Sequence, residues 1–331
     1  MKVAVDAMGG DYAPREIVLG AIAACRELDA EVILVGREEE LARELKEQAV
    51  SGLKLEVYPA SEIIAMDEHP ANAVKKKKDS SLVVANRLVK EGSAVAVISA
   101  GNTGAAMTAS LLTVGRIKGI KRPAIASPLP TNRGVSVLID AGANADCEPD
   151  NLAQFALMGS VYAERVLGIP TPRVGLLNIG EEETKGNKLS SEAHQLLKAG
   201  KLNFIGNIEG KDIPQGVCDV IVCDGFVGNI VLKLSEGLAF ALVDQLKKAI
   251  LAGFLSKIGG LLIKSAFRDL KSKMDYSEYG GAPLLGIDGI SIISHGRSNA
   301  KAIKNAIRAA LKAADQGIIA KIATAVQEEL V

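Results

Sequence analysis

Short runs of apolar residues recur along the chain, and most of them end at a glycine or a polar residue. The first run, Val3–Val5, is followed by Asp6, and the last covers residues 290–293. Further runs lie at residues 32–35, 95–98, 135–139, 174–179 and 220–223. Apolar runs of about four to eight residues between turn residues are typical of buried strands.

Helical patterns lie between these runs. From residue 299 to 315, apolar side chains recur at spacings of three and four, and Ser298 is expected to cap that helix. Another helix is expected at Ile230–Leu238. Buried strands that alternate with helices predict a three-layer α/β/α fold with a largely parallel sheet. Since no repeat or linker interrupts the pattern, we expect a single α/β domain over residues 1–331, with a protruding basic amphipathic helical segment at about 246–280.

Glycine-rich polar clusters follow several of the expected strands. In open parallel sheets, ligands bind beyond the carboxyl ends of the strands, so these clusters are expected to meet at one rim. The cluster at residues 99–104 precedes a helical pattern, and its small residues would let backbone N–H groups approach an anion. A tight strand-to-helix turn explains the same residues equally well.

Two further clusters carry side chains suited to acyl or phosphate chemistry. The cluster at residues 224–229 ends in Asn229, which is expected to open the next helix. Its amide could cap that helix or donate to a developing oxyanion. Lys185, beside Gly186, could hold a phosphate as a point charge, although a solvated charged turn is the simpler explanation. That segment does not match a Walker A loop, and no Gly-x-Gly-x-x-Gly occurs in the chain.

Composition narrows the function classes. Lys plus Arg and Asp plus Glu each number 39 in 331 residues, so the formal net charge is zero and nucleic-acid binding is not indicated. The four cysteines are scattered and indicate neither a zinc site nor disulfides. His194 is expected at the surface of a polar helix, whereas His295 lies in the last strand-end cluster and is the better site candidate. We expect no metal and no cofactor.

Two basic segments could face partners. The run Lys75–Lys78 is either a solvated face or a contact for an acidic partner or a phosphate. Residues 251–273 combine an apolar face with a basic stripe, which suits an anionic membrane surface, although a core-facing helix is equally consistent. The residues expected to make the membrane or partner contact are Lys257, Leu261, Leu262, Ile263, Lys264, Arg268 and Lys271.

Ten motifs occur in order along the chain, at residues 5–11, 99–104, 115–120, 140–144, 158–160, 175–178, 185–187, 203–207, 224–229 and 279–282. Together they resemble the acyl-ACP:phosphate acyltransferase family of phospholipid synthesis. The resemblance implies a fold similar to isopropylmalate dehydrogenases and phosphotransacetylases, and a homodimer. It also implies transfer of a long-chain fatty acyl group from acyl carrier protein to inorganic phosphate. The enzyme would be cytoplasmic, work at the inner face of the cell membrane, and pass acyl phosphate to a membrane glycerol-3-phosphate acyltransferase.

This chemistry requires groups that position phosphate and stabilise the oxyanion of a tetrahedral intermediate, and it needs no strong base. We expect Lys185 and Asn229 to be catalytic. The expected substrate-binding residues are Asp6, Gly9, Gly10, Ser99, Gly101, Asn102, Thr103, Gly104, Asp140, Asn144, Gly186, Asp224, Gly225, Gly228 and His295. The alternatives are a phosphotransacetylase that uses a CoA thioester, a dehydrogenase on the same fold, and a non-enzymatic membrane adaptor.

Overall fold

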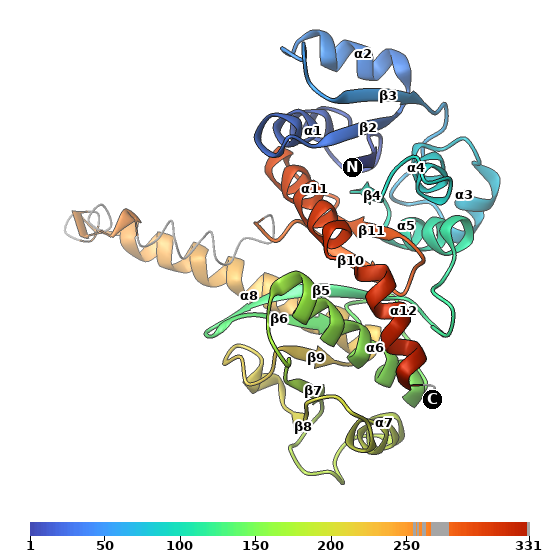
Figure 1. The fold of residues 1–331 in the computed structure, drawn as a ribbon. Coiled ribbons are helices and arrows are strands. Elements are labelled where there is room, and N and C mark those ends of the chain that lie inside the picture. The colour runs from blue at the N-terminus through green and yellow to red at the C-terminus, as the bar shows by residue number, and fades with distance from the viewer. Residues whose placement is uncertain (254–255, 257, 260–262, 266–277, 330–331) are drawn as a thin grey trace.

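The sheet is the central element of the fold. The structure is a computed structural model that describes residues 1–253, 256, 258–259, 263–265 and 278–329. Within these residues, 11 strands form a sheet in the order β3-β2-β1-β4-β11-β10-β5-β6-β9-β7-β8 (Figure 1). The strands are β1 (Lys2–Asp6), β2 (Glu31–Gly36), β3 (Leu55–Pro59), β4 (Ala96–Ser99), β5 (Ala124–Thr131), β6 (Gly134–Ile139), β7 (Val174–Leu177), β8 (Phe204–Ile208), β9 (Val220–Val222), β10 (Ala282–Leu285) and β11 (Ile290–Ile293).

Helices cover the sheet and connect its strands. They are α1 (Arg15–Leu28), α2 (Glu38–Lys46), α3 (Pro70–Lys76), α4 (Ser81–Lys90), α5 (Thr103–Ala109), α6 (Pro149–Tyr162), α7 (Lys188–Ala199), α8 (Gly225–Leu251), α11 (Ala300–Asp315) and α12 (Ile318–Glu329). The π-helical turns η1 (Ser110–Val114) and η2 (Ala163–Leu167) continue α5 and α6, and η3 (Gly210–Asp212) is a short 3-10 turn. The helix expected from residue 299 is capped by Asn299 rather than Ser298, because the Asn299 side-chain oxygen accepts from the Ala302 N–H at 3.0 Å.

Successive side chains of β1 point into different layers. Val3 and Val5 pack in the core cluster that includes Ile17 of α1 and Ile303 of α11. Ala4, between them, belongs to the cluster built with residues of α4. Because side chains alternate across a strand, the sheet is covered on both faces. The expected α/β class with helices on two sides is therefore confirmed.

The strands run in two directions, which corrects one prediction. β1 to β4 and β11 are parallel to one another, as are β6 to β9. β10 is antiparallel to both β11 and β5, and β5 is antiparallel to β6. These three reversals invert the second group relative to the first. The clusters after β1, β4 and β11 therefore leave one edge of the sheet and those after β6, β7 and β9 leave the other, so the prediction of one common rim is wrong.

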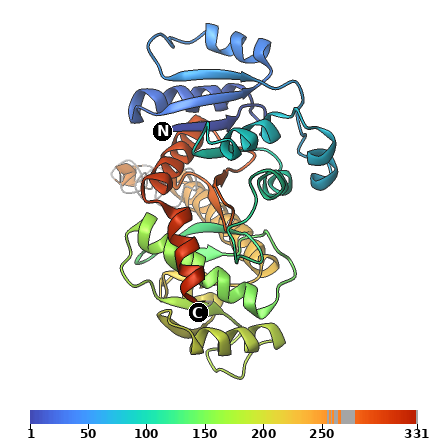
Figure 2. The same ribbon diagram turned by 45° about the vertical axis from the view of Figure 1, so that its right-hand side comes forward.

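Helix α8 extends away from the rest of the molecule (Figures 1 and 2). It spans 27 residues and contains the shorter helix expected at Ile230–Leu238, and of its residues only Gly225 and Gly228 are buried. Its length and mean hydropathy of 1.6 would allow it to cross a membrane, although those two properties alone are weak evidence. Exposed apolar side chains recur at every fourth position, namely Phe226, Ile230, Leu234, Leu238, Leu242 and Leu246.

The expected basic segment after α8 lies largely outside the described residues. Ile263 is 46% exposed, and Lys264 is exposed too. The other five residues expected to contact a membrane or partner fall outside the described part of the chain, namely Lys257, Leu261, Leu262, Arg268 and Lys271.

Candidate functional site

The loops after β1 and β4 are joined through the buried carboxylate of Asp6. Its two oxygens accept hydrogen bonds from the hydroxyls of Ser81 and Ser99 at 2.6 and 2.7 Å. Ser99 Oγ in turn accepts from the Gly101 N–H at 3.1 Å. Burial raises the pKa of the Asp6 carboxyl, and the two serine hydroxyls oppose that shift. A Cβ at Gly9 would lie 2.4 Å from Asp6 Oδ2, so glycine is required where the loops meet. Asp6 therefore positions the glycine-rich cluster at residues 99–104.

The remainder of this cluster starts helix α5. The Asn102 side-chain oxygen accepts from the Ala105 N–H at 3.0 Å, and its amide donates to the carbonyls of Met66 and Glu68. These contacts support the tight-turn explanation for Asn102, since its amide is engaged within the fold. Thr103 opens the helix, and a Cβ at Gly104, the next residue, would lie 2.7 Å from the ring of Pro70. Gly10 has a φ of +117° and packs against Ala100.

A second buried carboxylate, Asp140, organises the loop after β6. Its oxygens accept from the backbone N–H groups of Ile125, Ala143 and Asn144 at 3.0, 3.0 and 2.7 Å. The Asn144 amide donates to Asp140 Oδ2 at 2.9 Å and to the carbonyl of Pro123 at 2.8 Å. Burial raises the pKa of Asp140, while these donors favour its ionised form. The Asp140 carboxylate thus fixes the path of residues 141–144.

The first turns of α8 pack directly on this loop. Asp224 caps the helix, accepting from the Val227 N–H at 2.8 Å, so the expectation that Asn229 opens it is wrong. A Cβ at Gly228 would lie 1.9 Å from the Asp140 carbonyl oxygen, and one at Gly225 would lie 2.7 Å from Asp140 Oδ2. Asn229 sits one turn into the helix, and its side chain packs against Gly142, where an added Cβ would lie 3.4 Å from Asn229 Cβ. Its amide is therefore not used as a helix cap.

Lys185 lies in the loop after β7. The Asn178 amide donates to the Lys185 carbonyl at 3.0 Å, and the Lys185 N–H donates to the Glu182 carbonyl at 3.1 Å. Gly186 follows with a φ of +101°, where a Cβ would lie 2.1 Å from Ser190 Oγ. Within the described residues, no hydrogen bond or ion pair involves the exposed Lys185 side chain. The backbone of this loop is thus fixed, whereas the Lys185 amine is exposed and unpaired within the described residues.

A histidine expected at the surface supports the same loop from inside the fold. His194 is 2% exposed, so that expectation is wrong. Its Nδ1 lies 2.9 Å from the side-chain oxygen of Asn207, and the Asn207 amide donates to the Glu182 carbonyl at 2.9 Å. The polar neighbours of His194 in α7 face solvent, but this position faces Asn207 and the ring of Phe204, 5.1 Å away between centroids.

His295 and the lysine run occupy separate places. His295 is exposed after β11; its Nδ1 accepts from the Arg297 N–H at 3.1 Å, and it lies near Glu236 of α8. In the lysine run, Lys77 forms an ion pair with Glu68 at 2.6 Å and donates to the Ile63 carbonyl. Its amine is therefore already used by contacts within the fold. The other three lysines of the run, Lys75, Lys76 and Lys78, are exposed, so a partner could contact them.

A cavity of about 410 Å³ lies between the helix that follows β4 and the loop after β6. Its walls come from α5 and η1, from residues 116–123, and from the loop after β6. Met107 in its wall lies three residues after Gly104, which ends the cluster at residues 99–104. We call this cavity the cationic pocket; it is lined by Met107, Thr108, Leu111, Arg116, Lys121, Arg122, Pro123, Ala143 and Asn144. Asn144 was expected at a site from the sequence, whereas Arg122 and the apolar wall were not.

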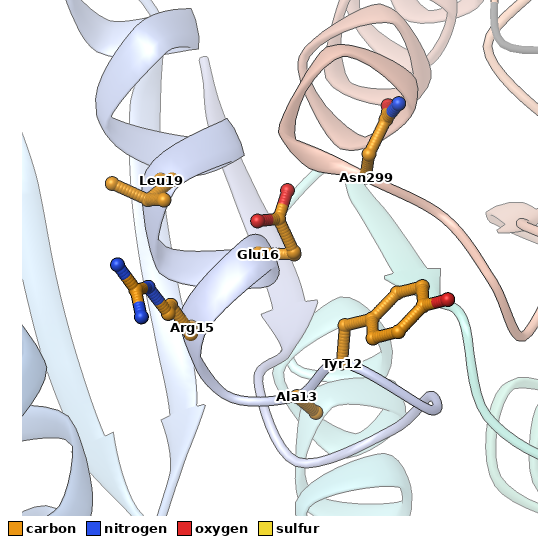
Figure 3. Close-up of a pocket in the computed structure, with 6 residues that line it drawn as sticks. All are labelled: Tyr12, Ala13, Arg15, Glu16, Leu19 and Asn299. Atoms are coloured by element: carbon orange, nitrogen blue, oxygen red, sulfur yellow. The ribbon is translucent and has the colours of Figure 1, made fainter.

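A larger cavity, of about 550 Å³, lies between the N-termini of α1 and α11. It is lined by Tyr12, Ala13, Arg15, Glu16, Leu19 and Asn299, and Figure 3 shows Glu16 directed from α1 toward the helix that follows Asn299. The Glu16 carboxylate accepts from the Ala300 N–H at 2.7 Å and so satisfies the start of α11. Because its carboxylate is used in this way, we consider this cavity the weaker site candidate.

The fold belongs to the phosphotransacetylase-like class of α/β proteins. A phosphotransacetylase from Streptococcus pyogenes superposes with a TM-score of 0.64 at 18% identity, covering 95% of this chain and 94% of the other. A 4-hydroxythreonine-4-phosphate dehydrogenase from Klebsiella pneumoniae matches with a TM-score of 0.52 at 16% identity, covering 94% of this chain and 97% of the other. At these identities the likeness concerns the fold alone.

Closer relatives define the family. The family model described as "Fatty acid synthesis protein" matches residues 1–321, so the chain belongs to that family. A protein named phosphate acyltransferase from Desulfitobacterium hafniense (strain DSM 10664 / DCB-2) is 57% identical over 323 residues, covering 97% of this chain and 96% of the relative. Another phosphate acyltransferase, from Geotalea uraniireducens (strain Rf4), is 55% identical over 328 residues, covering 99% and 95%.

Proposed function

We propose that the protein is a phosphate acyltransferase, which transfers a long-chain fatty acyl group from acyl carrier protein to inorganic phosphate. The observation that carries this proposal is the 57% identity, over 97% of the chain, to a relative of that name. The family description, fatty acid synthesis protein, supports a fatty acyl group as the cargo. The acyl phosphate product would serve phospholipid synthesis.

The reaction does not require a strong general base. Phosphate is anionic near neutral pH, so one of its oxygens can attack the thioester carbonyl carbon directly. The carbonyl π electrons move onto oxygen, and when this tetrahedral oxyanion collapses, the C–S bond breaks and the thiolate leaves and takes up a proton. Lys185 and Asn229 are the proposed donors to phosphate and to the oxyanion, because each lies beside a glycine-rich loop and makes no side-chain hydrogen bond within the described residues.

A direct assay tests the proposed function. The protein is incubated with long-chain acyl carrier protein, with and without inorganic phosphate, and free carrier thiol and acyl phosphate are measured. We expect thiol release that depends on phosphate and equals acyl phosphate formed. Equal or faster turnover with acyl-CoA would instead favour the phosphotransacetylase alternative. Liposome binding without any thiol release would favour the adaptor, and turnover with a change in nicotinamide absorbance would favour the dehydrogenase.

The exposed side of α8 supports a homodimer. A helix of 27 residues is about 40 Å long, and its apolar side chains at every fourth position leave a continuous stripe that the described chain does not cover. In a two-fold dimer, the same stripe on both copies would be buried at once. Five charged residues share the helix, namely Lys233, Glu236, Asp244, Lys247 and Lys248, which fits a protein partner better than lipid.

The double substitution Leu238→Asp, Leu242→Asp is expected to convert a dimer into a monomer, because it places four charges in the paired stripe. Light scattering coupled to size-exclusion chromatography measures the mass. Lys247→Asp, at an exposed polar position of the same helix, is the matched control and should remain dimeric. A monomeric unmodified protein at micromolar concentration would remove the dimer proposal.

The proposed site of action is the inner face of the cell membrane, where the enzyme would pass its product to a membrane glycerol-3-phosphate acyltransferase. A long-chain acyl phosphate is poorly soluble, which favours release beside a bilayer. Of the basic segment after α8, the described residues Ile263 and Lys264 are exposed, which supports a contact between this segment and the membrane. Sedimentation with anionic liposomes at low salt tests it, and a protein that stays in the supernatant would refute it.

A further inference from the structure

The cationic pocket combines two kinds of wall. Met107, Leu111 and Pro123 give it an apolar side. Its other side carries three cationic residues, and no aspartate or glutamate is among the described residues that line it. A volume of about 410 Å³ falls within the range of about 300–1,000 Å³ typical of small-molecule sites. These features suit a ligand that is both elongated and anionic.

The three cations are engaged to different degrees. The Lys121 amine pairs with the Asp150 carboxylate, whereas the Arg116 guanidinium donates to the Lys121 backbone carbonyl but keeps its charge. The side chain of Arg122 is exposed and, within the described part of the chain, makes no hydrogen bond or ion pair. A guanidinium presents paired N–H donors that match the oxygens of a phosphate group. Arg122 is therefore the cation of this pocket that the described fold engages least, and the first candidate to bind an anion.

The pocket also adjoins the proposed catalytic residues. Asn144 and Ala143 form part of its wall, and the Asn144 N–H donates to the Asp140 carboxylate at 2.7 Å. The residue before them, Gly142, packs against the side chain of Asn229. The Asn144 amide also donates to the carbonyl of Pro123, the residue after Arg122, at 2.8 Å, so Arg122 and the loop that contacts Asn229 adjoin the same part of the pocket.

We propose that the cationic pocket binds the phosphopantetheine arm of the acyl donor, with Arg122 holding its phosphodiester and the apolar wall contacting the pantetheine chain. This inference rests on the proposed function, since it assumes a thioester donor. Inorganic phosphate would use the charge of Arg122 but not the apolar wall, and a fatty acyl chain would use the wall but not the charge. The phosphopantetheine arm is the part of the donor that uses both.

The test compares two small donors that differ only in the phosphate, acyl-4′-phosphopantetheine and acyl-pantetheine. For the unmodified protein, kcat/KM should be about 10-fold or more higher with the phosphorylated donor, the scale of one charge-assisted hydrogen bond. Arg122→Ala should reduce this ratio to about 1 by lowering only the value for the phosphorylated donor. Arg122→Lys should restore part of the preference. Lys118→Ala, which removes an exposed cation from the same segment outside the pocket, should leave the ratio unchanged.

Several outcomes would overturn the inference. One is that Arg122→Ala shows the same ratio of kcat/KM between the two donors as the unmodified protein. Another is that Arg122→Ala lowers kcat/KM equally with both donors. A raised KM for inorganic phosphate with an unchanged donor ratio would assign Arg122 to the acceptor instead. Arg122→Ala should also lower kcat/KM with acyl carrier protein, because that donor carries the phosphorylated arm, whereas Lys118→Ala should not. Absence of phosphate-dependent thiol release by the unmodified protein, from any donor, would instead refute the proposed function itself.

Discussion

Replacing either Lys185 or Asn229 with alanine is expected to lower turnover by about 10²-fold or more, the typical cost of removing one preorganised donor. Neither side chain makes a hydrogen bond within the described residues, so neither substitution breaks a hydrogen bond of the fold, and Asn229→Ala keeps the Cβ that packs against Gly142. The loop around Lys185 remains fixed by the Asn178 amide, and Asn229 remains within α8. The expected defect therefore concerns the chemical step rather than the stability of the protein.

Single-turnover rates with saturating donor and phosphate measure this effect, and thermal unfolding of each variant checks the fold. Lys188→Ala is the matched control, because Lys188 lies three residues away, is 88% exposed and pairs only loosely with Glu192 at 3.8 Å. It should retain nearly full turnover. If the Lys185 or Asn229 variant also turned over at a near-normal rate, that residue would be excluded from the active site.

The strands that sequence reasoning found are those with unbroken aliphatic runs. Seven strands lie within a residue or two of the predicted runs, namely β1, β2, β4, β6, β7, β9 and β11. β5 was missed because it contains Pro128 and Pro130, which usually argue against a strand within a sheet. β10 was missed for the same reason, since Pro283 lies within its four residues. The edge strands β3 and β8, which are parallel to their neighbours, were missed as well, because polar residues interrupt their apolar runs.

Missing β5 and β10 explains why the prediction for the site was incomplete. The glycine-rich clusters can be located from local patterns, but their relative direction depends on β10 and β5, which reverse the sheet. Local patterns also leave Asn102 undecided between a tight turn and an anion-binding loop, and Asn229 undecided between capping and oxyanion stabilisation. The structure separates them, because Asn102 caps α5 whereas Asp224, not Asn229, caps α8. Arg122 could not be found from the sequence, since its pocket forms only where α5 meets the loop after β6.

The junction between α8 and the loop after β6 should be the position least tolerant of added volume. Gly228→Ala is expected to lower stability by about 3 kcal/mol, as overpacking does in a closed site. The added methyl group would lie 1.9 Å from the Asp140 carbonyl oxygen, so helix and loop would have to separate. That movement would displace Asn229, and a displacement of about 1 Å is enough to reduce turnover by about 10²-fold. Chemical denaturation and steady-state kinetics measure the two effects.

Gly237→Ala provides the matched control within the same helix. No described atom lies within 4 Å of a Cβ at Gly237, so the substitution adds the same methyl group without a clash. Alanine is favoured over glycine in a helix by about 0.5–1 kcal/mol, so this variant should be equally stable or slightly more stable and fully active. The opposite effects of one chemical change at two positions separate packing from helix propensity. Normal turnover by Gly228→Ala would show that close contact between α8 and Asp140 is not what positions Asn229.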